Sequence, residues 1–596
     1  MSKTNLKRIL LPISTLVMLL TAYRMFQLYQ LDRLWGHLPL SLFLSGWLTI
    51  LLIWEPRFSK QADKMKLFAG ASWSAVLLSL GFPTLPFTFL MFVGFVPLLW
   101  VEQQLSTRSE APAKWEVFKY SYHTFVVWNI LTTYWVANTL FVAGVVAVMV
   151  NALLMSIPFV LFHQTKKMLN PKLGYLGFVA YWVSFEYIHL RWEISWPWLT
   201  LGNSFAEFPS WVQWYEYTGV FGGSLWILLA NVLIFQSWQN YRSGKGFGKR
   251  GWQAAAWIII PLVLSLVMYF TYENRGKSVE VVSVQPNFEP HYQKFTVRRK
   301  DILDQFISLS ESQLTPETDY LLFPETSFGR IKIKDVVNSS NAMQALKAMV
   351  DRYPKLKLVS GISAQHIYEP GEPHSPAVRM HVRKTDTLYW ESYNAAVQLS
   401  SGQPDVPYYF KSILVPGAEF FPYRNILFFI KPLVDGLGGS FSGLGKQKER
   451  TAFFAEDGSG VAPVICYESI YGEYATGYVR KGANALFIVT NDGWWDNTAG
   501  HRQHMAFATL RAIETRRSIA RSANTGTSAF VNQRGDITQA TQYEEAIAIR
   551  GQIQLNDRLT FYVLWGDLIG RLLGFTAILL LLNTFVKARL PKDQQR

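Results

Sequence analysis

Long apolar segments fill the first 272 residues of this 596-residue chain, and one more lies near its C-terminus. A hydrocarbon core of about 30 Å needs roughly 20 apolar residues in each helix that crosses it. Candidate membrane spans therefore lie at residues 10–30, 34–54, 66–84, 86–101, 118–139, 141–163, 173–190, 221–239, 252–272 and 562–586. This pattern predicts a polytopic α-helical membrane protein.

The stretch between residues 273 and 560 has a different composition, with charged and turn-forming residues at the frequency of a globular domain. We therefore expect three parts along the chain. The first is a membrane domain of about nine helices at residues 1–272, and the second is a soluble domain at residues 273–560. A last transmembrane helix and a tail occupy residues 561–596.

The positions of the basic residues predict which side of the membrane each part occupies. The formal net charge is +15, and many Lys and Arg residues lie in short links between apolar runs. By the positive-inside rule such links are cytoplasmic, which places both termini inside and residues 273–560 outside the cytoplasm. A nucleic-acid-binding protein would instead gather these charges on one soluble face, so we exclude a nucleic-acid partner. The basic residues in these links include Lys3, Lys7, Arg8, Arg57, Lys60, Lys64, Lys66, Arg108, Lys114, Lys166, Lys167, Lys172, Arg242, Lys245, Lys249, Arg250, Lys587, Arg589, Lys592 and Arg596.

The outward link at residues 191–220 is unusually rich in tryptophan. Indole rings favour the membrane–water interface, so an aromatic belt explains the enrichment. A re-entrant segment that lines a lipid-entry groove explains it equally well. The tryptophans concerned are Trp192, Trp196, Trp198, Trp211 and Trp214.

Strand-like and helix-like segments alternate through the soluble part, which predicts a layered α/β domain. Two segments around Leu303 and Leu346 have the apolar spacing of helices. Several strands are continuous apolar runs, as expected for a sheet covered on both faces. The predicted strands are Val279–Val284, Tyr320–Phe323, Lys357–Val359, Ala395–Leu399, Val461–Ile465 and Leu486–Thr490.

The chain has a single cysteine, Cys466, so neither an intrachain disulfide nor a multi-cysteine metal site is expected. Cys466 follows the strand Val461–Ile465, and the residues from Glu468 to Lys481 can form a helix. Amide groups at the start of a helix would lower the pKa of a thiol placed there. This context favours a nucleophile, although a buried structural cysteine could occupy the same turn.

Two further polar residues stand at predicted strand ends. Glu325 closes the apolar segment Leu322–Pro324, and Lys411 stands beside the apolar stretch Ile413–Val415. Taken alone, each is equally a solvated loop residue. The order Glu325, Lys411, Cys466 resembles that of the nitrilase, or carbon–nitrogen hydrolase, superfamily. The same resemblance extends to Val284–Asn287, Asn491–Trp494, Arg511–Glu514, Arg521–Gly526 and Gly535-Asp536.

This resemblance covers the whole soluble part and implies an α-β-β-α sandwich with a Glu–Lys–Cys triad. Predicted membrane spans lie on both sides of the soluble part. With this arrangement the chain looks like one family of that superfamily, the apolipoprotein N-acyltransferases. Trp196–Gly202, Leu414–Phe420 and Cys466–Glu468 also resemble segments of that family. The resemblance implies acyl transfer from a phospholipid to the α-amino group of the diacylglyceryl cysteine of an apolipoprotein, in a bacterial inner membrane with the catalytic domain in the periplasm. We expect a monomer that uses no cofactor and no metal.

In the implied mechanism, Glu325 is the general base and Cys466 forms a thioester. Lys411 stabilises the oxyanion of the tetrahedral intermediate. Four residues match supporting positions of the family, each with a structural alternative. Glu419 orients Lys411 or forms a plain ion pair, Trp494 lines the substrate entrance or packs in the core, and Tyr467 and Glu468 serve activity or stabilise the following helix.

The loop Phe420–Leu433 is amphipathic and either dips into lipid or packs within the domain. Two other functions remain open. A membrane-tethered amidase or hydrolase would use the same triad with water as acceptor. A transporter or sensor with an inactive binding domain is disfavoured, because the spans carry few of the intramembrane charges and broken helices that mark substrate pathways.

Overall fold

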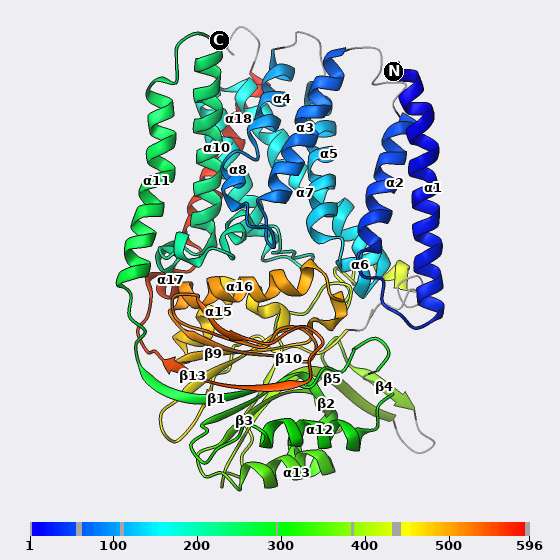
Figure 1. Ribbon diagram of the computed structural model, residues 1–596, viewed down its shortest axis with the longest axis vertical. Coiled ribbons are helices and arrows are strands. Elements are labelled where there is room, and N and C mark those ends of the chain that lie inside the picture. Colours follow the sequence, from blue (N-terminus) through cyan, green and yellow to red (C-terminus); the bar gives the residue numbers. More distant parts are fainter. Residues whose placement is uncertain are drawn as a thin grey trace.

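The computed structural model describes residues 3–54, 62–107, 113–293, 296–382, 387–431 and 443–590. Its helices stand side by side as a bundle above a β-sheet domain, and both described ends of the chain lie at the end of the bundle far from the sheets (Figure 1). The bundle consists of α1 (Lys3–Gln30), α2 (Leu38–Trp54), α3 (Ala62–Leu80), α4 (Val96–Ser106), α5 (Ala113–Thr133), α6 (Val136–Thr139), α7 (Phe141–Met168), α8 (Pro171–His189), α10 (Val220–Arg242), α11 (Gly248–Thr271) and α18 (Leu568–Arg589).

Within the described residues, six helical segments are long and apolar enough to cross a membrane: α1, α4 with the preceding 3-10 turn η2 (Thr88–Phe92), α7, α10, α11 and α18. The other predicted spans form helices that are shorter or more polar. Helix α5 shows why such sequences are tolerated, because it packs between α3 and α7. Its buried Thr124 hydroxyl donates to the Ala71 carbonyl and its Asn129 amide to the Phe125 carbonyl. Polar groups paired inside a bundle are not exposed to lipid.

Two predicted spans differ from the helices of the structure in where they begin, end or break. The span predicted at residues 86–101 is broken into η2 and α4, and α4 continues to Ser106. The span predicted at 118–139 ends at Thr133 and is followed by the separate short helix α6. Of the basic residues in the predicted cytoplasmic links, Arg57, Lys60, Arg108, Lys592 and Arg596 lie outside the described residues.

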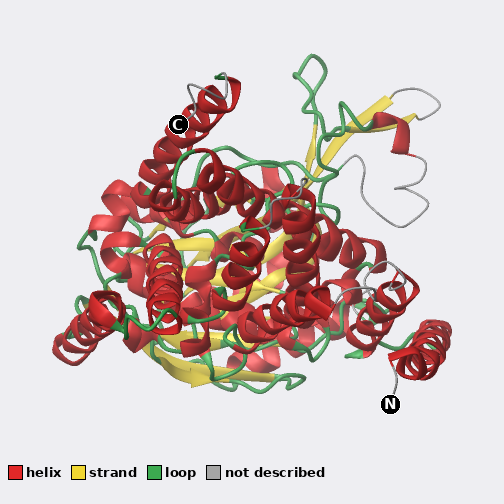
Figure 2. Ribbon diagram, turned by 90° about the horizontal axis from the view of Figure 1, so that it is seen from above, coloured by secondary structure: helices red, strands yellow, loops and turns green. Residues whose placement is uncertain are grey.

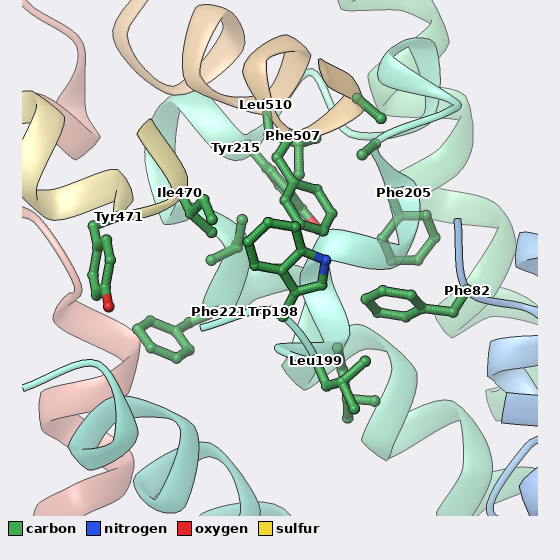
Figure 3. Packing of buried hydrophobic residues seen from close by; sticks show 14 of the residues in the cluster. Phe82, Trp198, Leu199, Phe205, Tyr215, Phe221, Ile470, Tyr471, Phe507 and Leu510 are labelled. Carbon is green, nitrogen blue, oxygen red and sulfur yellow. The ribbon is translucent and has the colours of Figure 1, made fainter. Parts of the chain in front are cut away.

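The tryptophan-rich link packs between the bundle and the soluble domain. Trp198 is fully buried, and it lies among aromatic and aliphatic side chains from both parts of the molecule (Figure 3). Phe82, Phe205 and Phe221 belong to the bundle part, whereas Phe507 and Leu510 belong to the soluble part. We call residues 195–206 the junction segment. Its apolar residues join the two parts into one continuous core.

The soluble part contains two sheets. One has seven strands in the order β13 (Ile547–Leu555), β1 (Lys277–Gln285), β2 (Tyr320–Lys332), β3 (Lys357–Ile367), β5 (Thr387–Ser400), β4 (Arg379–Val382), with β6 (Tyr408–Phe410) also paired to β5. The other has six in the order β12 (Ile537–Ala540), β11 (Ala529–Val531), β10 (Ser518–Ala523), β9 (Ala485–Thr490), β8 (Gly460–Ile465), β7 (Phe453–Phe454). All six predicted strands are present, and each is longer than predicted.

The two sheets pack face to face, with β1 and β2 against β9 and β10. Helices α12 (Arg299–Glu311) and α13 (Asn341–Val350) cover the first sheet on its outer side, and α15 (Gly472–Arg480) and α16 (Ala499–Thr515) lie between the second sheet and the bundle (Figure 1). This α-β-β-α sandwich below a polytopic helical domain is the predicted fold class. Seen along the bundle, the helices stand over the sheets, while the β4–β5 hairpin projects past their edge (Figure 2).

Candidate active site

Glu325 stands at an irregularity in β2. The pairing of β2 with β3 shifts register between Phe323 and Phe328, and Thr326 has a φ of 51°. Across from this bulge, β3 has Gly361, where a Cβ atom would lie only 2.5 Å from the Pro324 carbonyl oxygen. Bulges re-aim side chains next to active sites, and here the local chain needs a glycine opposite it. The Glu325 side chain is thereby directed into the buried interior of the domain.

Lys411 follows β6 and is buried between two carboxylates. Its Nζ lies 3.2 Å from Glu325 Oε1 and 3.0 Å from Glu419 Oε1. Burial alone would lower the pKa of Lys411, but the negative charges of Glu419 and Glu325 outweigh it and hold the pKa above its usual value. Lys411 is therefore an ammonium group with a fixed position.

Asn394 on β5 links the two carboxylates and was absent from our predicted site. Its Nδ2 donates to Glu325 Oε1 at 2.6 Å and to Glu419 Oε1 at 3.0 Å, and its backbone carbonyl accepts from the Lys411 amide at 2.8 Å. Asn394 lies one position before the predicted strand Ala395–Leu399. Nothing in the sequence distinguishes it there from an ordinary polar residue at the start of a strand. Glu419 itself is fixed by the Val415 amide, which donates to its Oε2 at 2.8 Å.

Cys466 follows the fully buried strand β8 in a tight turn. Its φ is 47°, in the left-handed region that residues with a Cβ atom rarely adopt. The side chain is 7% exposed, and both Glu325 and Lys411 are close enough to act electrostatically on its thiol. The structure therefore brings the three predicted residues together from strands β2, β6 and β8, which belong to both sheets.

The charge state of the thiol differs from our expectation. Burial disfavours the thiolate and the Glu325 carboxylate adds to this effect, so the pKa of Cys466 lies above its usual value, although Lys411 acts in the opposite direction. The predicted lowering by helix amides is wrong for the resting site. Cys466 begins the short 3-10 turn η8 (Cys466–Ile470), and the helix α15 begins six residues after the cysteine, beyond the short range of a helix dipole.

Two family models match most of the chain. The apolipoprotein N-acyltransferase N-terminal domain matches residues 74–233, and the carbon-nitrogen hydrolase domain matches residues 291–558. A protein from Chlorobaculum tepidum named apolipoprotein N-acyltransferase is 29% identical, over 85% of this chain and 95% of its own length. The chain belongs to the apolipoprotein N-acyltransferase family.

A second family member, the apolipoprotein N-acyltransferase of Geobacter metallireducens, is 25% identical over 83% of this chain and 90% of its own length. Among solved structures, Saccharomyces cerevisiae Nit3 of the nitrilase superfamily has a TM-score of 0.33 and 16% identity, covering 50% of this chain and 96% of that one. Helices α1 and α2 precede the region that the N-terminal family model matches.

In this family member, Glu468 is a fully buried carboxylate that joins two parts of the site. Its Oε1 accepts from the Ser412 amide at 2.7 Å and the Tyr409 hydroxyl at 2.5 Å, and its Oε2 accepts from the Ile465 amide at 3.0 Å. Burial raises the pKa of Glu468, against the opposing effect of these donors. Because it binds the residues next to Lys411 and Cys466, Glu468 fixes the two strand ends relative to each other.

Tyr467 and Trp494 both lie where the soluble domain meets the bundle. The Tyr467 hydroxyl donates to the Ser195 carbonyl in the junction segment at 2.8 Å. Trp494 is half-buried, its ring centroid lies 5.0 Å from that of His291 in an edge-to-face arrangement, and its carbonyl accepts from the Thr139 hydroxyl of α6 at 3.3 Å. These contacts show how the two residues join the domains, and their roles in activity remain predictions.

The loop after Lys411 combines buried and exposed apolar residues. Phe420 and Phe421 are half-buried, whereas Phe428 and Phe429 in the turn η7 (Phe428–Ile430) are exposed. The Tyr423 amide donates to Glu193 Oε2 of the outward link at 2.5 Å. The side chain of Ile430 and the whole of Leu433 lie outside the described residues. In the described parts of the chain, no group of three or more His, Cys, Asp or Glu side chains could hold a metal ion.

Proposed function

We propose that this family member transfers an acyl chain from a membrane phospholipid to the α-amino group of the diacylglyceryl N-terminal cysteine of apolipoproteins. The observation that carries the proposal is the meeting of Glu325, Lys411 and Cys466 in one buried site directly below the helix bundle. Membership of the apolipoprotein N-acyltransferase family supports lipoprotein N-acylation as the reaction.

The first half-reaction forms a thioester. Because the pKa of Cys466 is raised at rest, the thiol needs a base, and Glu325 takes the Sγ proton as Sγ attacks the glycerol ester carbonyl carbon. The Lys411 ammonium group lies beside Glu325, where it stabilises the oxyanion of the tetrahedral intermediate. When the intermediate collapses, the ester C–O bond breaks and the lysophospholipid alkoxide leaves with the proton from Glu325.

The second half-reaction uses the same groups in the reverse sense. The α-amino nitrogen of the acceptor attacks the thioester carbonyl and passes a proton to Glu325. The C–S bond then breaks, the new amide leaves, and the Glu325 proton returns to Sγ. Because one product leaves before the second substrate reacts, the kinetics are ping-pong.

The arrangement of the chain supports a division at residues 1–272, 273–560 and 561–596 and a location in the bacterial inner membrane. The described ends of the chain, at Lys3 and Leu590, lie at the end of the bundle far from the sheets (Figure 1). With the basic links cytoplasmic, the site opens on the periplasmic side, where both lipid substrates reach it from the bilayer.

The second candidate function is hydrolysis, because water could discharge the same thioester.

The test is to incubate the purified full chain with a phospholipid that has a labelled acyl group and to analyse the protein by mass spectrometry. We expect an acyl adduct on Cys466 that is absent from Cys466→Ala and that a diacylglyceryl-cysteine peptide discharges. An adduct on another residue would overturn the assignment of the nucleophile. Discharge by water alone, with no acylated peptide, would favour the hydrolase.

A further inference from the structure

Two buried side chains hold the backbone carbonyl of Cys466. The Ser469 hydroxyl donates to this oxygen at 2.7 Å, and Nε2 of His504 on α16 lies 3.2 Å from the same oxygen. His504 Nε2 also lies 2.8 Å from Ser469 Oγ. Because Ser469 uses its only hydrogen on the Cys466 carbonyl, its Oγ can only accept from the ring. The partners therefore assign a hydrogen to Nε2 of His504.

The opposite edge of the His504 ring faces a buried ion pair. Nδ1 lies 2.9 Å from Asp492 Oδ1, and Arg521 Nη2 lies 2.6 Å from Asp492 Oδ2. Burial alone would raise the pKa of Asp492, but the charges of Arg521 and His504 hold it below its usual value. All three side chains are excluded from solvent. The ring is thus fixed at both nitrogens, with Nε2 directed at the nucleophile's own backbone.

The Cys466 carbonyl needs such support, because a φ of 47° is unfavourable for a residue with a side chain. Conformations of this kind persist at functional sites when the surrounding structure over-determines them. A different backbone angle at Cys466 would move Sγ away from Glu325 and Lys411. The contacts of Ser469 and His504 therefore determine where the thiol points.

The His504 ring also packs against the junction segment, which connects it to the helix bundle. Its ring lies 6.0 Å from that of Trp198 in the junction segment and 5.4 Å from that of Trp495. The preceding residue, Gln503, accepts a hydrogen bond from Trp198 Nε1 at 2.7 Å and donates to the Pro83 carbonyl at 2.7 Å. Figure 3 shows how closely buried side chains surround Trp198. The bundle thereby fixes the part of α16 that supports Cys466.

We propose that His504 is a positioning residue for the nucleophile: its Nε2–H group, held by Asp492 and Arg521, fixes the Cys466 carbonyl directly and through Ser469. The proposal rests on the proposed function in one respect, since it takes Cys466 as the nucleophile. It assigns to His504 no contact with either substrate. It also makes the junction segment part of the catalytic framework.

Two nearly isosteric variants separate the two nitrogens of the ring. The amide nitrogen of His504→Gln reaches the position of Nε2, whereas that of His504→Asn reaches only the position of Nδ1. We expect His504→Gln to keep kcat within about fivefold of the unchanged protein and His504→Asn to lower kcat by about ten- to hundredfold, the usual effect of a lost positioning contact. KM for the phospholipid should change by less than about twofold in both.

The matched control is His501, which is buried on the same helix and contacts Asn497 and Tyr543 instead of Cys466. His501→Asn should keep both kcat and KM. Equal kcat in His504→Asn and the unchanged protein would overturn the proposal. So would an equal loss in His504→Gln and His504→Asn, because a role in general packing does not distinguish the nitrogens.

Alkylation of Cys466 by iodoacetamide tests the position of the thiol independently of the proposed function, because alkylation requires no acyl transfer. Cys466 is the only cysteine, so the rate of alkylation reports on this thiol alone. Glu325 raises the pKa of the Cys466 thiol more strongly than Lys411 lowers it. A thiol displaced from both groups therefore forms its thiolate more readily, so we expect at least threefold faster alkylation in His504→Asn than in His504→Gln. Equal rates would overturn the positioning role. Failure of the unchanged protein to form an acyl adduct on Cys466 would overturn the proposed function and the role of Cys466 as its nucleophile, while unequal alkylation rates would still show that His504 positions the Cys466 thiol.

Discussion

The two walls of the candidate site differ in how they are held. The inner wall, formed by η8 and α16, is buried against the bundle, and its Tyr467, Ser469 and His504 side chains all make hydrogen bonds. The outer wall is the loop from Pro416 to Lys431, whose residues Ile426, Phe428 and Phe429 are 70%, 68% and 66% exposed. One wall therefore has a fixed geometry, and the other presents apolar surface.

This difference matches two requirements of a reaction on lipids. The reacting groups need a fixed geometry, which close packing and paired polar groups provide. The lipid substrates of the proposed reaction would need an apolar route from the bilayer to the site, and the exposed aromatic residues of the outer wall favour contact with lipid. We infer that the inner wall determines the chemical step and the outer wall determines access.

Removing the charges of the site should have the largest effect. Lys411→Met removes the ammonium group and Glu325→Gln removes the proposed base, so we expect each to lower kcat by about 10²- to 10⁴-fold. The measurement is the rate of N-acylation of a diacylglyceryl-cysteine peptide in phospholipid vesicles. Lys481→Met, which removes a half-exposed ion pair with Glu449, is the control and should retain activity. Near-normal activity of either site variant would show that fixed geometry alone supports the reaction.

The same two variants should change the reactivity of Cys466 in opposite directions. Glu325 raises the pKa of the Cys466 thiol and Lys411 lowers it. At a fixed pH below that pKa, Glu325→Gln should therefore increase the thiolate fraction and Lys411→Met should decrease it. We expect alkylation by iodoacetamide to become about tenfold faster in the first and about tenfold slower in the second. In the unchanged protein the rate should rise with pH throughout the neutral range.

A shift of both variants in the same direction would contradict the electrostatic account of the inner wall. It would point to a change in access to the thiol, since access alters both rates alike. The comparison needs only the purified chain and its single cysteine. It is therefore independent of the identity of the acyl donor.

The sequence predicted the elements of the site better than their environment. Strand patterns placed Glu325, Lys411 and Cys466 at strand ends, because these patterns depend on local periodicity, and the resemblance to a known family singled out the three residues together. Asn394 and His504 escaped prediction, since their roles come from contacts with residues at least 12 positions away in the chain. The raised pKa of Cys466 was missed for the same reason, because burial by the packed sheets and bundle outweighs the local effect of a turn.

Glu468 offers a way to loosen the inner wall without touching the reacting groups. Glu468→Gln keeps the shape of the side chain but replaces one carboxylate oxygen by an NH₂ group. The one remaining oxygen cannot accept hydrogen bonds from both the Ser412 amide and the Ile465 amide, which bind different oxygens of Glu468. We expect kcat to fall by about tenfold and unfolding to occur at a lower temperature, by a few degrees in a thermal melt. Glu449→Gln on the exposed surface is the matched control. Unchanged kcat would show that the two strand ends keep their positions without this carboxylate.

The outer wall should give the smallest effect and the most selective one. We infer that Phe428 and Phe429 bind lipid, and replacing both by Ser removes this apolar surface. Full burial of such a ring contributes about 1.5–3 kcal/mol of binding free energy. Partial insertion reduces this gain, so we expect kcat/KM with phospholipid vesicles to fall by about three- to tenfold. A short-chain ester dissolved in water reaches the site without the bilayer, and its kcat/KM should stay constant. An equal loss with both substrates would mean that this loop contributes to the chemical step, and the division of labour between the two walls would then be wrong.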